Sequence, residues 1–323
     1  MPQLGSEPFH FVGCIGTEDR STAAFAEMRR FGSSVTQDFI EVVDPPSEYS
    51  VAAEAKRTAN SAALSTLMGS TVQRAPIDLF AREEVIANWI ERSVVCSPRV
   101  VLDISCLPKR FFFAALKMAL MSEHVKDLIV LYTPAGDYPA ADHMAQQPRD
   151  WRSLPFFGSE SFPDPKFDVA IVGVGFLPFG LPDLLKSGLD GAKPHLLFPF
   201  PASPSTVRKT WDFVRQINST LALSEENQII RVNGMDASDT FDHICWLTQQ
   251  GELNALFAPY GPKPMSLAMA IYAAATGSPV FYTQPRTYHP DYSTGWRISP
   301  TGAPEVTAYC VKLDGRTLYK VEG

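Results

Sequence analysis

The sequence predicts an α/β protein made of two Rossmann-like halves, each with a parallel sheet covered by helices. Strand-like and helix-like segments alternate along the chain, which is typical of repeated βαβ units. The chain has 323 residues, more than the ~250–300 at which a single core stops growing. The series also restarts after a segment rich in proline and turn residues, and several residue types recur about 150 positions later. We therefore place a first half at 1–140, a linker at 141–165 and a second half at 166–323.

The first half opens with the β-prone run FHFVGCI, followed by an amphipathic helix that Ser21 can cap. Its later strands are runs of β-branched and aromatic residues, and FFFAALKMALM at 111–121 is apolar on all sides, as in a buried helix. The expected strands lie at 9–15, 38–43, 100–105 and 127–133, and the expected helices at 22–31, 48–68, 79–95 and 111–121.

The second half repeats this order of elements. FDVAIVGVG at 167–175 is a strand that ends in a glycine turn, and Gly277 ends a long apolar helix. The tail at 306–322 contains Asp314-Gly315 between two β-prone runs, so we expect a β-hairpin that adds to the second half. The expected strands lie at 167–175, 195–200, 229–234, 253–258 and 279–283, and the expected helices at 181–188, 204–223, 238–250 and 265–277.

One composite motif occurs in both halves: a strand, a short turn, the dipeptide Pro-Lys and an apolar helix. Its lysines, Lys109 and Lys263, are 263 − 109 = 154 positions apart. A Tyr-Thr pair and a second tyrosine follow in each copy at a spacing of 282 − 132 = 150, namely Tyr132 with Tyr282 and Tyr138 with Tyr288. We expect the halves to be related by a pseudo-two-fold axis, with the two lysines facing a shared cleft.

The composition is that of an ordinary globular protein, with 45% hydrophobic and 20% charged residues. A net charge of −7 argues against a broad surface for duplex nucleic acid. The five cysteines are scattered, without a C-x-x-C pair, so neither a disulfide framework nor a metal site is expected. No apolar run is long enough to span a membrane and no signal peptide is evident. We expect a cytoplasmic protein with no membrane partner.

The repeated Pro-Lys motif has the properties of a phosphate site. Loops at the carboxyl ends of strands form the ligand crevice of an open α/β sheet, and the next helix presents free N–H groups and a positive dipole end. A lysine in such a loop adds a full charge, which favours a phosphate. Gly261 permits close backbone approach, and Ser105 and Ser266 supply hydroxyl groups. The alternative is that both lysines are solvated and both prolines merely begin helices.

The segment GPKPMSLAMAIYAAATGSPVFY resembles the G-x-T-K-x-M segment and apolar helix of the CRISPR-associated Rossmann-fold (CARF) sensor domains and of the related SAVED-like sensors. The resemblance implies a cyclic oligonucleotide bound across the two-fold axis, as part of an antiviral defence system with a separate protein effector. It places Gly261, Lys263, Met265 and Ser266 in the phosphate-binding segment. The sequence departs from the family at Pro262, where threonine is usual, and the first copy has Leu107 in place of the glycine.

A second candidate region is the charged turn GTEDRS, which follows the first strand. It contains Gly16, Glu18, Asp19 and Arg20, whereas the turn of the second half, GVGFLPFG with Gly175, is uncharged. Glu18 or Asp19 as general base and Arg20 as phosphate ligand would make an enzyme acting on a nucleotide or phosphoester. The alternative is a helix N-terminus that carries acids because they complement its dipole.

Asp103 interrupts an apolar strand and has Phe257 as its counterpart. It belongs either to the same one-sided catalytic site or, as we favour, to a structural contact with Lys109 or Arg110. We also name Arg110 as a candidate ligand residue.

The tyrosines after each Pro-Lys helix are the last candidates. Tyr132 and Tyr282 have the chemistry to stack on bases or to bond a ribose, although packing against a loop is the common role of such aromatic residues. GVGFLPFG lacks the third glycine of a dinucleotide fingerprint and no Walker sequence is present, so no cofactor is expected. The leading hypothesis is a nucleotide-sensing module. The alternatives are the enzyme and a partner-binding scaffold with a vestigial pocket.

Overall fold

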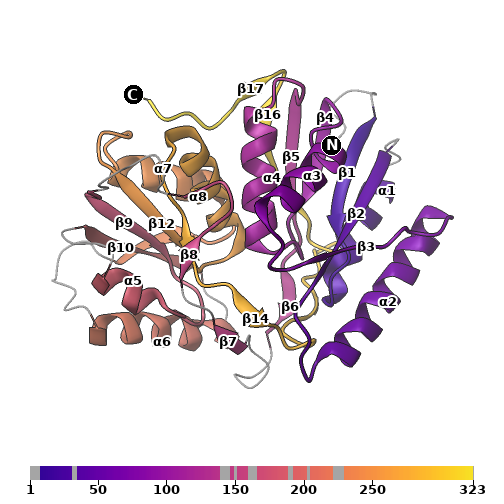
Figure 1. The fold of residues 1–323 in the computed structure, drawn as a ribbon, viewed down its shortest axis with the longest axis horizontal. Coiled ribbons are helices and arrows are strands. Elements are labelled where there is room, and N and C mark those ends of the chain that lie inside the picture. Colours follow the sequence, from indigo (N-terminus) through magenta and orange to yellow (C-terminus); the bar gives the residue numbers. More distant parts are fainter. Residues whose placement is uncertain are drawn as a thin grey trace. The chain divides into compact units, whose positions relative to one another are not determined.

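The chain folds into two compact α/β units (Figure 1). The computed structural model describes residues 8–30, 35–138, 146–148, 151–158, 166–187, 192–201, 204–220 and 229–322. Unit 1 comprises Met1–Gln147 and Pro285–Leu318, and unit 2 comprises Pro148–Gln284 and Tyr319–Gly323. Both sheets are mainly parallel, and eight α-helices lie in the described part of the chain.

Unit 1 contains a seven-stranded sheet in the order β17-β16-β5-β4-β1-β2-β3. Neighbouring strands from β5 to β3 are parallel. The strands are β1 (Phe9–Cys14), β2 (Val35–Val43), β3 (Ala75–Asp78), β4 (Arg99–Asp103), β5 (Asp127–Tyr132), β16 (Thr307–Leu313) and β17 (Arg316–Thr317). The helices are the 3-10 turn η1 (Asp19–Thr22), α1 (Ala23–Arg30), α2 (Ser50–Met68), α3 (Glu83–Ser93) and α4 (Lys109–Met121).

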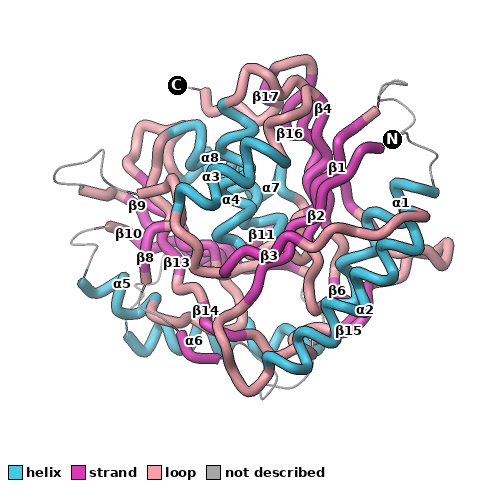
Figure 2. Tube along the Cα trace, turned by 45° about the vertical axis from the view of Figure 1, so that its right-hand side comes forward, coloured by secondary structure: helices cyan, strands magenta, loops and turns pink. Residues whose placement is uncertain are grey.

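The helices of unit 1 cover both faces of its sheet (Figure 2). Phe25 of α1 and Leu64 of α2 pack on one face together with Phe11 and Val101, while α3 packs on α4 on the other face. Every residue of β4 and β5 is buried. Strands covered on both sides need continuous apolar runs, which is what their sequences show.

Unit 2 contains a four-stranded parallel sheet in the order β11-β10-β9-β12. An isolated parallel bridge joins Phe257 of β12 to Val280. When the strands are numbered from the first strand of each unit, the first four strands of both sheets have the order 3-2-1-4. The strands are β9 (Val169–Gly173), β10 (Lys193–Phe200), β11 (Ile229–Asn233) and β12 (Ala255–Pro259), and the helices are α5 (Leu181–Ser187), α6 (Pro204–Thr220), α7 (Ala237–Leu247) and α8 (Lys263–Thr276).

Three short two-stranded sheets complete the described structure. They are β6 (Ala135–Asp137) with β15 (Thr294–Trp296), β7 (Gln146–Pro148) with β14 (Pro285–Thr287), and β8 (Arg152–Ser153) with β13 (Phe281–Tyr282). The sheets of β6 with β15 and of β8 with β13 are antiparallel. β6 and β14 begin 285 − 135 = 150 positions apart, which is the spacing of the tyrosine repeat. β7 and β15 begin 294 − 146 = 148 positions apart. Of the four strands β6, β7, β14 and β15, the first thus pairs with the last and the second with the third.

The C-terminal strands differ from the expectation. The two-residue turn Asp314-Gly315 connects β16 to β17, and both turn residues have positive φ, 49° and 75°. However, β16 pairs antiparallel with β5, so it belongs to the sheet of unit 1 and not to the second half. β5 would otherwise be an open edge, and β16 covers it while burying Tyr309 and Val311.

Some expected boundaries also differ. β3 was not expected, and the helix expected at 79–95 begins only at Glu83. The strand expected at 279–283 is reduced to the Val280 bridge and β13. The described part of the expected linker contains β7 and β8. Linker residues 141–145, 149–150 and 159–165, and the expected helix positions 31, 188 and 221–223, lie outside the described residues.

Candidate functional site

The two Pro-Lys dipeptides occupy equivalent local positions. In unit 1, β4 ends at Asp103 and α4 begins at Lys109, directly after Pro108, whose φ is −59° and ψ 149°. In unit 2, α8 begins at Lys263, directly after Pro262, whose φ is −52° and ψ 154°. Neither first turn contains an acidic residue, and both lysines are half-buried. Each lysine therefore lies where a helix presents its free N–H groups.

Both positions adjoin the point where the strand order of the sheet reverses. β1 lies between β2 and β4, and β9 lies between β10 and β12. In open α/β sheets the ligand crevice forms at the carboxyl ends of the strands at this point. The loops after β1 and β4, and those after β9 and β12, are therefore the places where each unit would hold a ligand.

Glycines allow the two loops of unit 2 to touch. A Cβ on Gly175 would lie 2.1 Å from the carbonyl oxygen of Tyr260. A Cβ on Gly261 would lie 3.1 Å from the carbonyl oxygen of Val174 and 3.3 Å from the carbonyl carbon of Gly173. The close approach that we expected Gly261 to offer a ligand is thus made to the loop after β9.

Ser266 and Met265 support the Lys263 turn from inside the unit. Both side chains are fully buried. The Ser266 hydroxyl donates to the carbonyl oxygen of Pro262 at 3.1 Å, and Met265 lies beside Gly261. These contacts hold the Pro-Lys turn in place.

Asp103 and Ser105 brace the turn that leads to Lys109. Buried Asp103 accepts hydrogen bonds from the hydroxyl of Ser105 at 2.5 Å and from its backbone N–H at 2.9 Å. The Ser105 hydroxyl in turn accepts from the backbone N–H of Thr133 at 2.8 Å. Ser105 is thus one partner of Asp103, and their contact ties the end of β4 to the end of β5. Arg110 donates to the carbonyl oxygen of Ala81 at 2.8 Å.

The charged turn after β1 forms a buried ion pair. Arg20, 3% exposed, donates to Glu18 at 2.8 and 3.1 Å and to the carbonyl oxygen of Thr133 at 2.9 Å. Burial alone would lower the pKa of Arg20, but the Glu18 carboxylate raises it well above its usual value, so the guanidinium stays charged. Asn60, which the sequence did not single out, donates to the carbonyl oxygens of Gly16 and Glu18 at 2.8 and 3.1 Å.

The two candidate tyrosines have different environments. Tyr132 is 4% exposed, and its hydroxyl accepts a long hydrogen bond of 3.4 Å from Arg20. Tyr282 is half-buried, and its ring centroid lies 5.2 Å from that of Tyr260. The Tyr260 hydroxyl donates to Phe179 and Thr283. Tyr132 therefore packs inside unit 1, whereas Tyr282 is only half-buried.

Sequence reasoning missed Asp44, which directly follows β2 at the carboxyl edge of the first sheet. Its carboxylate accepts from the backbone N–H of Tyr288 at 3.2 Å. Burial raises the pKa of Asp44 to about 6, against the lowering effects of the Tyr288 N–H and Arg57. Asp44 directly follows the strand expected at 38–43, and this position is the sequence signal that could have identified it as a candidate.

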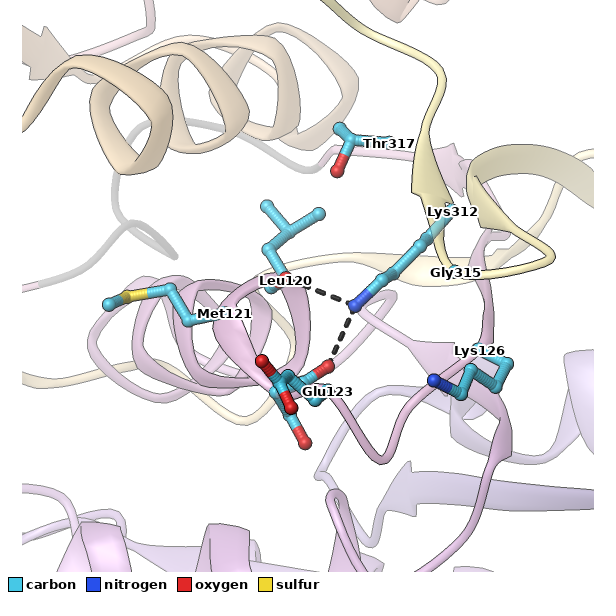
Figure 3. A pocket seen from close by; sticks show the side chains of 8 residues that line it. Leu120, Met121, Glu123, Lys126, Lys312, Gly315 and Thr317 are labelled. Carbon is cyan, nitrogen blue, oxygen red and sulfur yellow. Dashed lines mark hydrogen bonds between the residues drawn. The ribbon is translucent and has the colours of Figure 1, made fainter.

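A polar pocket of about 310 Å³ lies at the opposite end of α4 (Figure 3). Lys312 of β16 donates there to the carbonyl oxygens of Leu120 and Ser122 at 3.1 and 2.8 Å. A lysine that bonds the last carbonyls of a helix stabilises its C-terminus. We therefore assign Lys312 a structural role.

Within the described residues, no group of three or more histidine, cysteine, aspartate or glutamate side chains could hold a metal ion. No described helix is both long enough and apolar enough to cross a membrane. No protein-family model matches the chain, and the search of curated proteins gave no match.

Proposed function

We propose that this protein binds a phosphate-containing ligand, a nucleotide or a cyclic oligonucleotide, at its two Pro-Lys helix N-termini. The observation that carries the proposal is the equivalent placement of Lys109 and Lys263. Each is the first residue of an apolar helix that follows the fourth strand of a 3-2-1-4 sheet, beside the first strand. Helix N–H groups and a lysine charge together suit a phosphate and disfavour a cation.

A repeated binding segment supports a ligand with more than one phosphate. The first four strands of the two sheets have the same order, and the short strands β6 and β14 recur at the 150-residue spacing. Their reciprocal pairing with β15 and β7 is what exchange of a strand between two copies of one repeat would produce. A cyclic oligonucleotide, as in the CARF-like sensors that the sequence resembles, has more than one phosphate. A separate effector protein would then respond to its binding.

Binding without turnover is favoured by the contacts of the acidic candidates. Glu18 is engaged with buried Arg20, and Asp103 with Ser105. A general base needs hydrogen-bond reach to a substrate proton, and these bonds direct both carboxylates into the protein. We therefore propose a sensor that acts in the cytoplasm rather than an enzyme.

Substituting either lysine should weaken binding of the ligand without affecting the fold. A charge-assisted hydrogen bond contributes about 1.5–3 kcal/mol, so Lys109→Ala and Lys263→Ala should each weaken binding roughly ten- to a hundred-fold. Neither should shift the melting temperature by more than about 2 °C, because a half-exposed lysine contributes little to stability. Mass spectrometry of the denatured protein first identifies any bound oligonucleotide. Calorimetric titration at fixed salt then measures the affinity of each variant for it, and thermal unfolding measures the melting temperature.

Lys117→Ala, on the same helix as Lys109, and Lys193→Ala, at the start of β10, are matched controls that remove one charge without touching the Pro-Lys turns. Both should leave the affinity unchanged. Unaltered affinity in both Pro-Lys variants would show that the motif only begins helices, and equal losses in all four variants would show a non-specific charge effect.

A further inference from the structure

A single segment of unit 1, residues 288–295, crosses the carboxyl ends of β1 and β2. We call this segment the latch. Its first residue donates a backbone hydrogen bond to Asp44, and its last, Gly295, donates one to Asp19 at 2.8 Å. Between them, the Ser293 hydroxyl donates to Glu18. The latch therefore contacts three carboxylates at the edge of the sheet where the fold would place a ligand.

The attachment of the latch is mainly polar. Ser293 is buried, whereas the ion pair at the middle of the latch is accessible to water. Asp291 pairs with Lys56 at 2.5 Å, with side chains 46% and 30% exposed. The latch also makes ring contacts, since Tyr292 lies 5.9 Å from Tyr138 and His289 lies 4.9 Å from Tyr49 between centroids. A segment attached mainly through polar contacts opens at a lower free energy than the core does. The neighbouring strand β16 differs, because it is part of the seven-stranded sheet and buries Val311 completely.

We propose that the latch is a pH-sensitive cover of the carboxyl edge of β1 and β2, and that it opens and closes without unfolding of unit 1. Opening would release the latch contacts of Glu18, Asp19 and Asp44 together. The proposal goes beyond the ligand proposed above and needs no ligand for its test, so either proposal can fail while the other holds.

Asp44 supplies the pH dependence. The groups around it are Arg57 of α2, Asp78 at the end of β3 and the Tyr288 N–H of the latch. With the latch closed, burial raises the pKa of Asp44 from 3.8 to about 6. An open latch returns the carboxylate to water and its pKa toward the lower value. Protonation therefore favours the closed form, and ionisation above pH 6 favours opening.

The size of the effect follows from this difference in pKa. Between pH 7.5 and pH 5 the open fraction should fall about tenfold, since the closed form takes up a proton that the open form does not. The range stays above the pH at which ordinary carboxyl groups take up protons, about 4. His289, which is also part of the latch, accepts at Nδ1 from the backbone N–H of Asp291 at 3.0 Å.

The open fraction is measured by hydrogen exchange. It is the exchange rate of peptides covering 288–295 divided by their intrinsic exchange rate at each pH. We expect about tenfold greater protection at pH 5 than at pH 7.5, with no change in β16. Asp44→Asn should protect the latch equally at both pH values. His289→Gln should keep the pH dependence, as should Asp137→Asn, an exposed acid of β6 opposite Thr294.

Lys56→Met provides a test that leaves Asp44 intact. It removes the ion pair to Asp291, so protection should fall at both pH values while the ratio between them stays about tenfold. The proposal is overturned if the wild-type latch is equally protected at pH 5 and pH 7.5. It is also overturned if Asp44→Asn retains the pH dependence, or if β16 exchanges together with the latch.

Discussion

Alanine in place of Gly175 should destabilise unit 2 by about 3 kcal/mol or more, at the upper end of what overpacking costs. The added Cβ would lie 2.1 Å from the carbonyl oxygen of Tyr260 and 2.8 Å from its carbonyl carbon. These are backbone atoms, so no change of rotamer relieves the contact. Tyr260 is also held through its hydroxyl by Phe179 and Thr283, which leaves the chain little freedom to move away.

The matched control is Gly277→Ala at the end of α8. Gly277 has φ 73°, and a Cβ there would have no neighbour within 4 Å. Its substitution costs only the left-handed conformation, about 1 kcal/mol. Urea unfolding followed by far-UV circular dichroism compares the two variants. Equal losses would mean that the loops after β9 and β12 do not pack as closely as the structure has them.

The contact between these loops separates what the sequence could predict about the site from what it could not. Proline with its fixed φ marks a helix start, so the positions of Lys109 and Lys263 at helix N-termini followed from local sequence. Gly261 was also recognised as a point of close approach, but its neighbour is the loop after β9. No local pattern identifies that neighbour, because it depends on which strands become adjacent.

Most parts of the fold that escaped prediction depend on non-local contacts. The C-terminal hairpin has a local turn signal at Asp314-Gly315. The sheet that the hairpin joins, however, is determined by the open edge of β5. The contact between Asp44 and Tyr288 joins residues 288 − 44 = 244 positions apart. Strand β3 has four residues and contains a proline, so its run is too short to show an alternating pattern.

Arg20→Met should be the other large effect, destabilising unit 1 by about 3–5 kcal/mol. The substitution leaves Glu18, whose side chain is 15% exposed, without its cation. It also removes the donor to the carbonyl oxygen of Thr133. A buried charge left without its partner costs more than the ion pair contributes, because the desolvation of the remaining group is no longer offset.

An exposed arginine on the next helix gives the control. Arg30 is 58% exposed and forms a surface pair with Glu27. Arg30→Met should change stability by no more than about 0.5 kcal/mol. Thermal and urea unfolding of the two variants should therefore separate clearly, and similar values would contradict a buried ion pair at Arg20.

The double variant decides whether the charged turn is structural or catalytic. If Glu18 and Arg20 mainly stabilise each other, adding Glu18→Gln to Arg20→Met should recover part of the lost stability, because it removes the unpaired charge. The two substitutions should then show a coupling free energy of about 1–3 kcal/mol. A catalytic Glu18 predicts a different pattern. Glu18→Gln would then abolish turnover of a phosphoester with little loss of stability, and its effect would add to that of Arg20→Met. The hydrogen bonds of Glu18 to Arg20 and Ser293 lead us to expect coupled stabilities and no turnover, and an additive cycle would restore the enzymatic alternative.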